Sequence, residues 1–183
     1  MRVIAGTARS VPLLSREGLD TRPTADRVKE AVFNIIQFEI EGRQVLDLFG
    51  GSGQMAIEAL SRGADGAVIV DQSRESISMI RQNLSKTRLT AHAEVLCADY
   101  MEFLSQNKKK FDLIFLDPPY RENFLEKALK KISEIDILKS GGIIICERPA
   151  EKVLPNTYTA FYRVREYRYG KTGITVYRAG ASS

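Results

Sequence analysis

The sequence predicts an α/β fold in which a mostly parallel sheet carries helices on both faces and an antiparallel strand at one edge. From Gln44 onward, short apolar runs alternate with helical patterns, as in consecutive βαβ units. The first apolar run ends in the glycine-rich segment 50–53, which suits a turn between a strand and a helix. The last two apolar runs are joined by a short turn at Gly170-Lys171, so we expect a hairpin there.

The expected elements follow one another in a regular order. Apolar runs predict strands at Val45–Phe49, Ala67–Val70, Ala93–Cys97, Phe111–Leu116 and Gly142–Cys146, and a terminal hairpin of Tyr158–Tyr167 and Gly173–Tyr177. Apolar residues at helical spacing predict helices at Met55–Arg62, Glu75–Thr87, Met101–Gln106 and Phe124–Ile135, with Gly63 as the C-cap residue of the first.

The first 43 residues differ from this rhythm. Val3-Ile4 and Val11–Leu14 are expected to form a small hairpin. Thr24 is a suitable N-cap for a helix that runs to about Phe38 and carries an apolar stripe. This segment is too short to fold alone, so we expect residues 1–43 to dock on a catalytic core of residues 44–178 within one domain, 1–183.

Composition is that of an ordinary globular protein, with 44% hydrophobic and 27% charged residues among 183. No apolar run approaches the ~18 residues of a membrane span, and the N-terminus lacks the apolar region of a signal peptide. Cys97 and Cys146 lie in apolar runs and are expected to be reduced core residues of a cytoplasmic protein. Two cysteines and His92 do not supply a metal site, so no metal is expected.

The glycine-rich turn predicts a nucleotide-containing cofactor. Glycine allows a backbone to approach a ligand closely, and Asp71 follows at the end of the next strand, where a carboxylate can accept both ribose hydroxyls. Gly51 and Gly53 with Asp71 also satisfy the dinucleotide-binding pattern. This motif alone therefore leaves S-adenosylmethionine and NAD as alternatives.

Further residues favour S-adenosylmethionine. Asp47 precedes the glycines, where a carboxylate would meet the ammonium group of a methionine moiety. After the third strand, Asp99 offers an acceptor for an adenine amine, with Tyr100 beside it. The predicted cofactor-binding residues are Asp47, Phe49, Gly50, Gly51, Gly53, Asp71, Gln72, Asp99 and Tyr100.

The segment Asp117-Pro118-Pro119-Tyr120 predicts the chemistry. It follows a buried strand, and the carboxyl ends of strands are where open α/β sheets bind ligands. The two prolines remove N–H donors, so the turn presents carbonyl oxygens, a carboxylate and an aromatic ring. These groups suit the exocyclic amine of a planar base. We expect Asp117 and the Pro118 carbonyl to accept its two N–H bonds while Tyr120 stacks on the base.

Basic residues predict a nucleic-acid partner. The net charge is +4 and the pI is about 9.1, which is compatible with a polyanion. The residues assigned to contact this partner are Arg22, Thr24, Arg27, Arg168, Lys171 and Thr172. Solvated surface arginines and lysines are the alternative interpretation.

Several segments together resemble the bacterial 16S ribosomal RNA guanine-N2 methyltransferases of the RsmD family. They are Arg22-Pro23-Thr24 with Asp26-Arg27, Glu30–Asn34, Asp47–Gly53, Glu58–Ala64 and Asp117–Tyr120, in the family's order and spacing. The resemblance covers roughly residues 1–178. It implies a class I, Rossmann-like methyltransferase fold with a seven-stranded sheet whose last strand is antiparallel.

The resemblance also implies methylation of a guanine N2 amine, with 16S rRNA or the assembling small ribosomal subunit as partner. Two positions depart from the family pattern. Gly51 stands where alanine is usual, and Asp71-Gln72-Ser73 replaces the commoner Glu-x-Asp.

Three alternatives stay open at this point. The same chemistry on another RNA or on DNA adenine-N6 or cytosine-N4 is the nearest, although the chain lacks a separate target-recognition segment. An NAD-dependent oxidoreductase is a second, and a non-catalytic RNA-binding module is the third.

Overall fold

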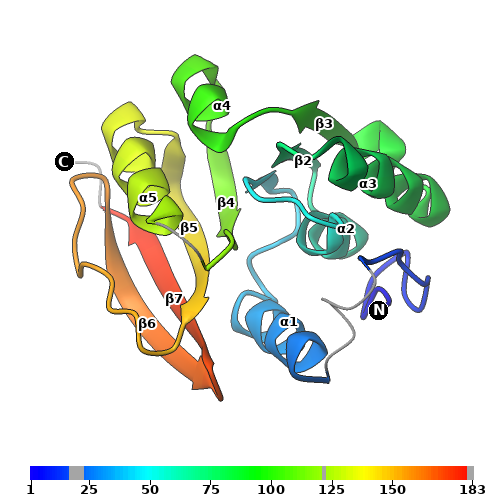
Figure 1. The fold of residues 1–183 in the computed structure, drawn as a ribbon, viewed down its shortest axis with the longest axis horizontal. Helices are drawn as coiled ribbons and strands as arrows, with labels where there is room; N and C mark the ends of the chain where they lie inside the picture. Colours follow the sequence, from blue (N-terminus) through cyan, green and yellow to red (C-terminus); the bar gives the residue numbers. More distant parts are fainter. Residues whose placement is uncertain (17–22, 121–122, 181–183) are drawn as a thin grey trace.

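A seven-stranded sheet forms the centre of the molecule (Figure 1). The computed structural model describes residues 1–16, 23–120 and 123–180. The strands are β1 (Gln44–Asp47), β2 (Gly66–Asp71), β3 (Ala93–Cys97), β4 (Phe111–Leu116), β5 (Leu138–Pro149), β6 (Phe161–Tyr169) and β7 (Thr172–Ala179). Their order across the sheet is β3-β2-β1-β4-β5-β7-β6. Among the described residues, no helix has the length and apolarity needed to cross a membrane.

Strand direction follows the prediction. β1 to β5 are parallel, and β7 pairs antiparallel with both β5 and β6. The terminal hairpin is confirmed, but its first strand begins at Phe161 rather than Tyr158. β5 is longer than expected because its ladder with β4 extends back to Leu138 across an irregularity in register. Gly141, inside this stretch, has a φ of 71°.

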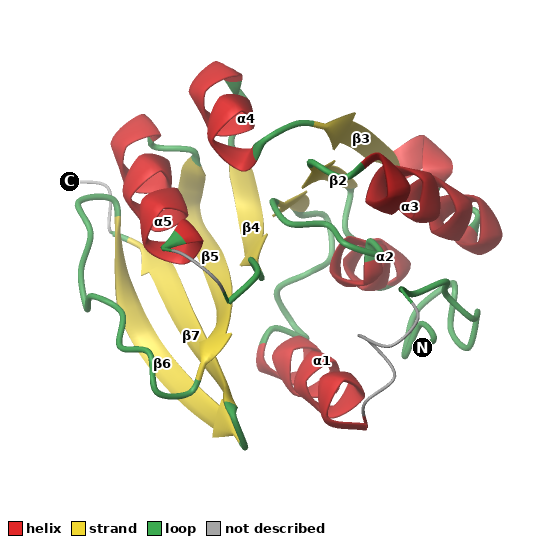
Figure 2. Cartoon of the chain, viewed as in Figure 1, coloured by secondary structure: helices red, strands yellow, loops and turns green. Residues whose placement is uncertain are grey.

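Helices cover both faces of the sheet (Figure 2). They are α1 (Pro23–Ile35), α2 (Gln54–Ser61), α3 (Arg74–Thr87), α4 (Tyr100–Gln106) and α5 (Phe124–Ile135), with a short 3₁₀ turn at Thr90–His92. Side chains alternate along each strand, so Val45 and Leu113 pack with α1, α2 and α3. Leu46 and Ile114 pack with α4 and α5 on the opposite face.

Helix α1 differs from its predicted bounds at both ends. Its first helical residue is Pro23, so Thr24 lies inside the first turn and is not the N-cap. Proline favours this position because the first helical N–H has no partner within the helix. The helix ends at Ile35, and Phe38 beyond it is 92% exposed. The predicted stripe residues Val28 and Val32 are buried.

Helix α2 ends as predicted at a glycine. Gly63 has a φ of 100°, and its amide donates to the Leu60 carbonyl at 3.1 Å. The amide of Ala64 donates to the Ala59 carbonyl at 3.0 Å. This pair of bonds is a Schellman motif, and it satisfies carbonyls that the helix end leaves without partners.

The N-terminal segment contains no strand of its own among the described residues; it makes one antiparallel bridge between Arg2 and Pro12. Residues 1–16 are hydrogen-bonded to α2 near their start and to α3 near their end. The Ile4 and Ala5 amides donate to the buried carboxylate of Glu58 at 2.9 and 3.0 Å. A Cβ at Gly6 would lie 1.8 Å from the Ser61 carbonyl oxygen, so only glycine fits this contact.

One core prediction is wrong. Cys146 is fully buried, but Cys97 is exposed. β3 is one of the two edge strands of the sheet, and only β2 pairs with it. An apolar run on an edge strand is not covered on all sides, which explains the difference.

Candidate active site

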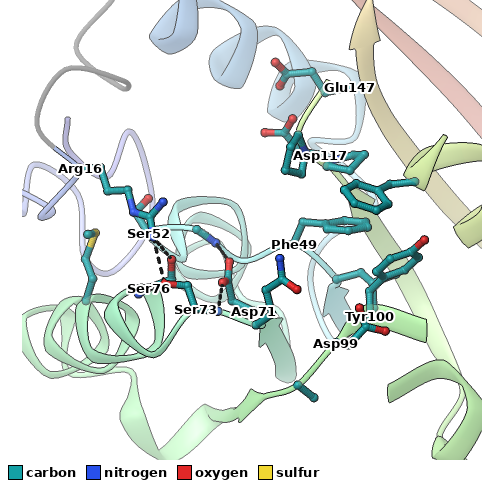
Figure 3. Close-up of a pocket in the computed structure, with 18 of the residues that line it drawn as sticks. Arg16, Phe49, Ser52, Asp71, Ser73, Ser76, Asp99, Tyr100, Asp117 and Glu147 are labelled. Atoms are coloured by element: carbon teal, nitrogen blue, oxygen red, sulfur yellow. Dashed lines mark hydrogen bonds between the residues drawn. The ribbon is translucent and has the colours of Figure 1, made fainter. Parts of the chain in front are cut away.

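A cavity of about 540 Å³ opens at the carboxyl ends of the parallel strands (Figure 3). Turns after β1, β2, β3 and β4 contribute to it, together with residues of α3, the N-terminal segment and β5. Among its lining residues are ten of the predicted site residues: Phe49, Gly51, Asp71, Gln72, Asp99, Tyr100, Asp117, Pro118, Pro119 and Tyr120. The sheet topology thus brings together groups that lie up to 71 residues apart in sequence.

The three glycines of the first turn have different roles. Gly51 has a φ of 59°, and a Cβ built on it would meet nothing within 4 Å, because this position faces the cavity. Gly50 packs against β2, where a Cβ would lie 2.6 Å from Ile69. Gly53 has a φ of 80° and is the residue that precedes α2. Gly51 therefore lines the cavity, whereas Gly50 and Gly53 shape the turn behind it.

Asp71 joins the end of β2 to this turn. Its Oδ2 accepts the Gly51 amide at 2.9 Å, and its Oδ1 accepts the Ser73 amide at 2.8 Å. Ser73 in turn caps α3, accepting the Ser76 amide. The carboxylate is fixed at the cavity wall by two backbone donors, and the wall presents it to a ligand.

Asp99 ends the turn after β3. Its Oδ1 accepts the amides of Met101 and Glu102 at 2.8 and 3.1 Å, so Asp99 is the N-cap of α4. The capping and cofactor interpretations are compatible, because both of these bonds end on one oxygen. Tyr100 beside it is buried between the rings of Phe49 and Phe124, with centroids at 5.1 and 5.4 Å.

Asp47 lies behind the glycine turn and does not line the cavity. Its side chain is buried, and Oδ2 has no hydrogen-bond partner among the described residues. Burial raises the pKa of Asp47 to about 7, although the Ala56 amide stabilises the ionised form. A buried acceptor of this kind at the end of β1 fits a cationic group that enters the site.

The acid-Pro-Pro-aromatic turn lies at the end of β4. Asp117 is exposed and Pro118 is buried, and both line the cavity. The Tyr120 residue is 54% exposed, and its hydroxyl donates to Oε1 of Glu147 at 3.3 Å. Partial burial and the nearby Glu147 carboxylate raise the pKa of Tyr120 to about 12. The tyrosine hydroxyl therefore remains a donor at neutral pH.

The predicted nucleic-acid contacts are dispersed. Arg22 and the side chain of Thr24 lie outside the described residues. Arg27 is exposed on α1, away from the cavity lining. Arg168 pairs with Glu151 at 2.8 Å, and the Lys171 side chain is exposed in the β6–β7 turn.

Thr172 is the one described member of this group with a contact at the site. It begins β7, and its hydroxyl is hydrogen-bonded to Tyr120. Thr172 thus connects the terminal hairpin to the wall of the cavity.

Residues that sequence patterns did not assign also line the cavity: Arg16, Leu48, Ser52, Ser73, Ser76, Met79, Ala98, Phe124 and Glu147. Arg16 donates to the hydroxyls of Ser73 and Ser76 at 3.0 and 3.3 Å. Its position depends on how the N-terminal segment docks, for which the sequence carries no signal. Glu147 is different, because its place just after a predicted strand is a detectable signal. In the described part of the chain, no cluster of three or more His, Cys, Asp or Glu side chains is placed to hold a metal ion.

The strand order, the glycine turn and the carboxylates at successive strand ends define a class I S-adenosylmethionine-dependent methyltransferase fold. A sequence model of the family described as "Conserved hypothetical protein 95" matches residues 1–178. Ribosomal RNA small subunit methyltransferase D of Haemophilus influenzae is 36% identical over 185 residues, covering 97% of this chain and 92% of that protein. The Escherichia coli protein of the same name is 33% identical, covering 99% and 91%. The chain therefore belongs to the RsmD family of ribosomal RNA methyltransferases.

The fold is also similar to those of solved structures. The structure of yhhF from Escherichia coli superposes with a TM-score of 0.89 at 32% identity, covering 100% of this chain and 99% of that one. A hypothetical protein of Thermus thermophilus, TTHA0928, gives a TM-score of 0.81 at 26% identity, covering 96% and 98%. The resemblance inferred from the motifs is thus confirmed, and with it the seven-stranded class I fold.

Proposed function

We propose that the protein methylates the exocyclic N2 amine of a guanine in 16S ribosomal RNA, with S-adenosylmethionine as the methyl donor. The observation that carries the proposal is one continuous cavity, lined by the glycine turn and Asp71 on one side and by Asp117 to Tyr120 on the other. A donor site and an amine site are therefore within reach of each other. Membership of the RsmD family favours this reaction over the NAD alternative.

The residues present fit the proposed cofactor. Gly51 leaves open space where any other side chain would project, and the buried Asp47 oxygen is an unpaired acceptor for an ammonium group. Asp71 would accept ribose hydroxyls, and Asp99 would accept the adenine amine. When bound, S-adenosylmethionine supplies an electrophilic methyl group on a sulfonium sulfur.

The chain's own contribution is to position and activate the amine. A guanine N2 lone pair is delocalised into the ring, so the amine is a poor nucleophile. Asp117 and the Pro118 carbonyl accept its two N–H bonds, which favours a pyramidal nitrogen and stabilises the positive charge that develops on it. Once N2 carries the methyl group, Asp117 would accept the excess N2 proton and pass it to water, so that the product amine is neutral. Tyr120 stacks on the base.

The base must leave its stack or come from an unpaired loop to reach this cavity. The exposed Lys171 at the β6–β7 turn and Arg27 of α1 are the candidates for phosphate contact. We place the protein in the cytoplasm, where 16S rRNA and the assembling small subunit are its proposed partners.

The test uses small ribosomal subunits and free 16S rRNA from a strain that lacks this gene. The purified protein is supplied with methyl-labelled S-adenosylmethionine, and the modified nucleotide is located by mass spectrometry. The proposal requires a single N2-methylguanine in one of the two substrates. Label on an adenine or cytosine amine, or no label on either substrate, would contradict it.

A further inference from the structure

A second carboxylate, Glu147, lies on the same wall of the cavity as Asp117 (Figure 3). The two acids occupy matching positions on neighbouring parallel strands, because Leu116, the last residue of β4, pairs with Cys146 inside β5 and each acid follows directly. Residues in register on adjacent strands are about 4.8 Å apart and point to the same face of a sheet. The site therefore presents two acceptor groups side by side, and the mechanism above uses only one of them.

Contacts from two other elements orient Glu147. The Tyr120 hydroxyl donates to its Oε1 at 3.3 Å, and the Thr172 hydroxyl is hydrogen-bonded to Tyr120. A tyrosine hydroxyl of ordinary pKa, 10.0, is protonated at neutral pH, and burial raises the pKa of Tyr120 further, to about 12, so this hydroxyl is a donor. The carboxylate at position 147 is thus directed by a chain of hydroxyls that begins on β7.

The three amino-bearing bases differ at the ring position next to the amine. Guanine carries an N1–H donor on the Watson–Crick side of its N2 amine, so two donors lie next to each other there; the N3 acceptor is on the other side of the amine. Adenine and cytosine carry a ring nitrogen acceptor, N1 or N3, beside their amines. An ionised carboxylate only accepts hydrogen bonds, so it pairs with the guanine edge and is repelled by the other two.

We propose that Glu147 selects guanine by accepting its N1–H while Asp117 and the Pro118 carbonyl hold the N2 amine. This inference rests on the proposed function and names the residue that decides which base enters. Glu147 is a specificity-determining residue under this proposal, and it takes no part in the methyl transfer itself. Under this proposal the same geometry would exclude adenine and cytosine from the site.

The experiment compares two RNAs that keep the reacting amine. Once the methylated guanine is mapped, small-subunit RNA is prepared with either guanine or 2-aminopurine at that position. 2-Aminopurine retains the 2-amine but has an acceptor at N1. Sites that hydrogen-bond a substrate N–H reject analogues without it by up to about 10⁴-fold. We expect the wild-type protein to prefer guanine at least about 100-fold in kcat/KM.

The variant Glu147→Gln carries the sharper prediction. A glutamine amide can accept the guanine N1–H through its Oε1 and can donate to the N1 acceptor of 2-aminopurine, so the preference for guanine should shrink to about tenfold or less. Glu134→Gln, an exposed acid on α5, is the matched control with the same charge change and should keep the wild-type preference. Binding of S-adenosylhomocysteine should be unchanged in both variants.

The outcomes separate the two levels of the proposal. A wild-type protein that methylates no guanine overturns the proposed function. A protein that methylates guanine while Glu147→Gln keeps the wild-type preference overturns only the role of Glu147. If Glu147→Gln does not bind S-adenosylhomocysteine, the wild-type ratio decides alone, and a preference below about tenfold refutes the inference.

Discussion

The Gly51 amide donates a hydrogen bond to Oδ2 of Asp71 at 2.9 Å, although the two residues are 20 positions apart. This bond joins the turn after β1 to the end of β2, so the two motifs that predict a nucleotide site form one structural unit. Asp71 is therefore expected to organise the turn as well as to contact a ribose.

Asp71→Ala should weaken cofactor binding strongly. The substitution removes the acceptor for the proposed ribose hydroxyls and leaves the Gly51 and Ser73 amides without their partner. Losing even one hydrogen bond to a charged group costs about 1.5–3 kcal/mol, so the Kd for S-adenosylhomocysteine should rise by at least about 10- to 100-fold. Isothermal titration calorimetry measures it. Asp71→Asn keeps one carbonyl oxygen and should lose less affinity. An alanine variant that binds S-adenosylhomocysteine as tightly as the wild type would show that Asp71 does not contact the cofactor.

Asp117→Ala should abolish methyl transfer with little effect on the cofactor. Loss of one positioned group that stabilises developing charge typically costs about 10²–10³ in kcat. Asp117 lies on the opposite side of the cavity from Asp71, so the affinity for S-adenosylhomocysteine should stay within about threefold, which is under 1 kcal/mol. Single-turnover assays on the mapped RNA give the rate. An active alanine variant would rule out the mechanism proposed for the amine.

Asp47 should make stability depend on pH. Its folded-state pKa, about 7, lies above the ordinary value of 3.8, so the folded protein binds this proton more tightly than the unfolded chain. The contribution of Asp47 to stability is therefore present below pH ~4 and is lost as pH rises through about 7. The Asp47→Asn side chain cannot ionise. Between pH 5 and pH 8 its free energy of unfolding should therefore fall less than that of the wild type.

Urea unfolding at both pH values measures this difference, and identical pH dependence in the two proteins would contradict the prediction. Cofactor binding supplies an independent check. If ionised Asp47 meets the proposed ammonium, then affinity for S-adenosylhomocysteine in the wild type should rise between pH 6 and pH 8. The Asp47→Asn variant should bind weakly at both.

Lys171 should contribute to RNA affinity through charge alone. Its side chain is exposed at the tip of the β6–β7 turn, near Thr172 and therefore near the cavity rim. RNA binding should weaken steeply with salt, and Lys171→Ala should reduce the slope of log K against log salt by about one. Lys108→Ala serves as the control, because Lys108 precedes the amino end of β4, whereas the cavity lies at the carboxyl end of that strand. An unchanged slope would mean that the hairpin turn does not contact RNA.

Local patterns were sufficient for the fold and for most of the cavity. Strand ends in a parallel sheet converge on one edge, so Asp71, Asp99 and Asp117 could be placed together from their order alone. The buried residues of the strands could also be predicted, because side chains alternate along a strand and their spacing fixes which face of the sheet each one occupies. The elements whose bounds were wrong are those where proline or an irregular ladder decides, such as α1 and β5.

Long-range docking was beyond reach of the sequence. Arg16 enters the cavity because the N-terminal segment packs on α2 and, next to Arg16, is hydrogen-bonded to α3 through Leu14 and Asn83; no periodicity reports these contacts. Glu147 was missed for another reason. Glu147 follows an apolar run, as Asp117 does, but it is not followed directly by two prolines and an aromatic residue, the pattern that identified Asp117. Cys97 was misplaced because an apolar run does not reveal whether its strand lies at the edge of the sheet.

Glu58 is the residue whose loss should destabilise the fold most. Its side chain is fully buried and accepts the Ile4 and Ala5 amides, Nε of Arg62 at 2.9 Å and the Lys29 ammonium at 3.3 Å. One carboxylate thus joins the N-terminal segment, α1 and α2. Burial lowers the pKa of Lys29, and the Glu58 charge opposes that shift.

Glu58→Gln should cost about 3–5 kcal/mol in the free energy of unfolding, because it leaves two buried or partly buried cations without a counter-charge. Adding Lys29→Met removes one of these cations, so the double variant should recover part of the loss. Arg43→Gln, which breaks a partly exposed pair with Glu39 and an exposed hydrogen bond to the Gly141 carbonyl, should cost under about 1 kcal/mol and serves as the control. Urea unfolding gives all four values. A Glu58→Gln variant as stable as the Arg43→Gln control would show that the N-terminal segment docks without this carboxylate.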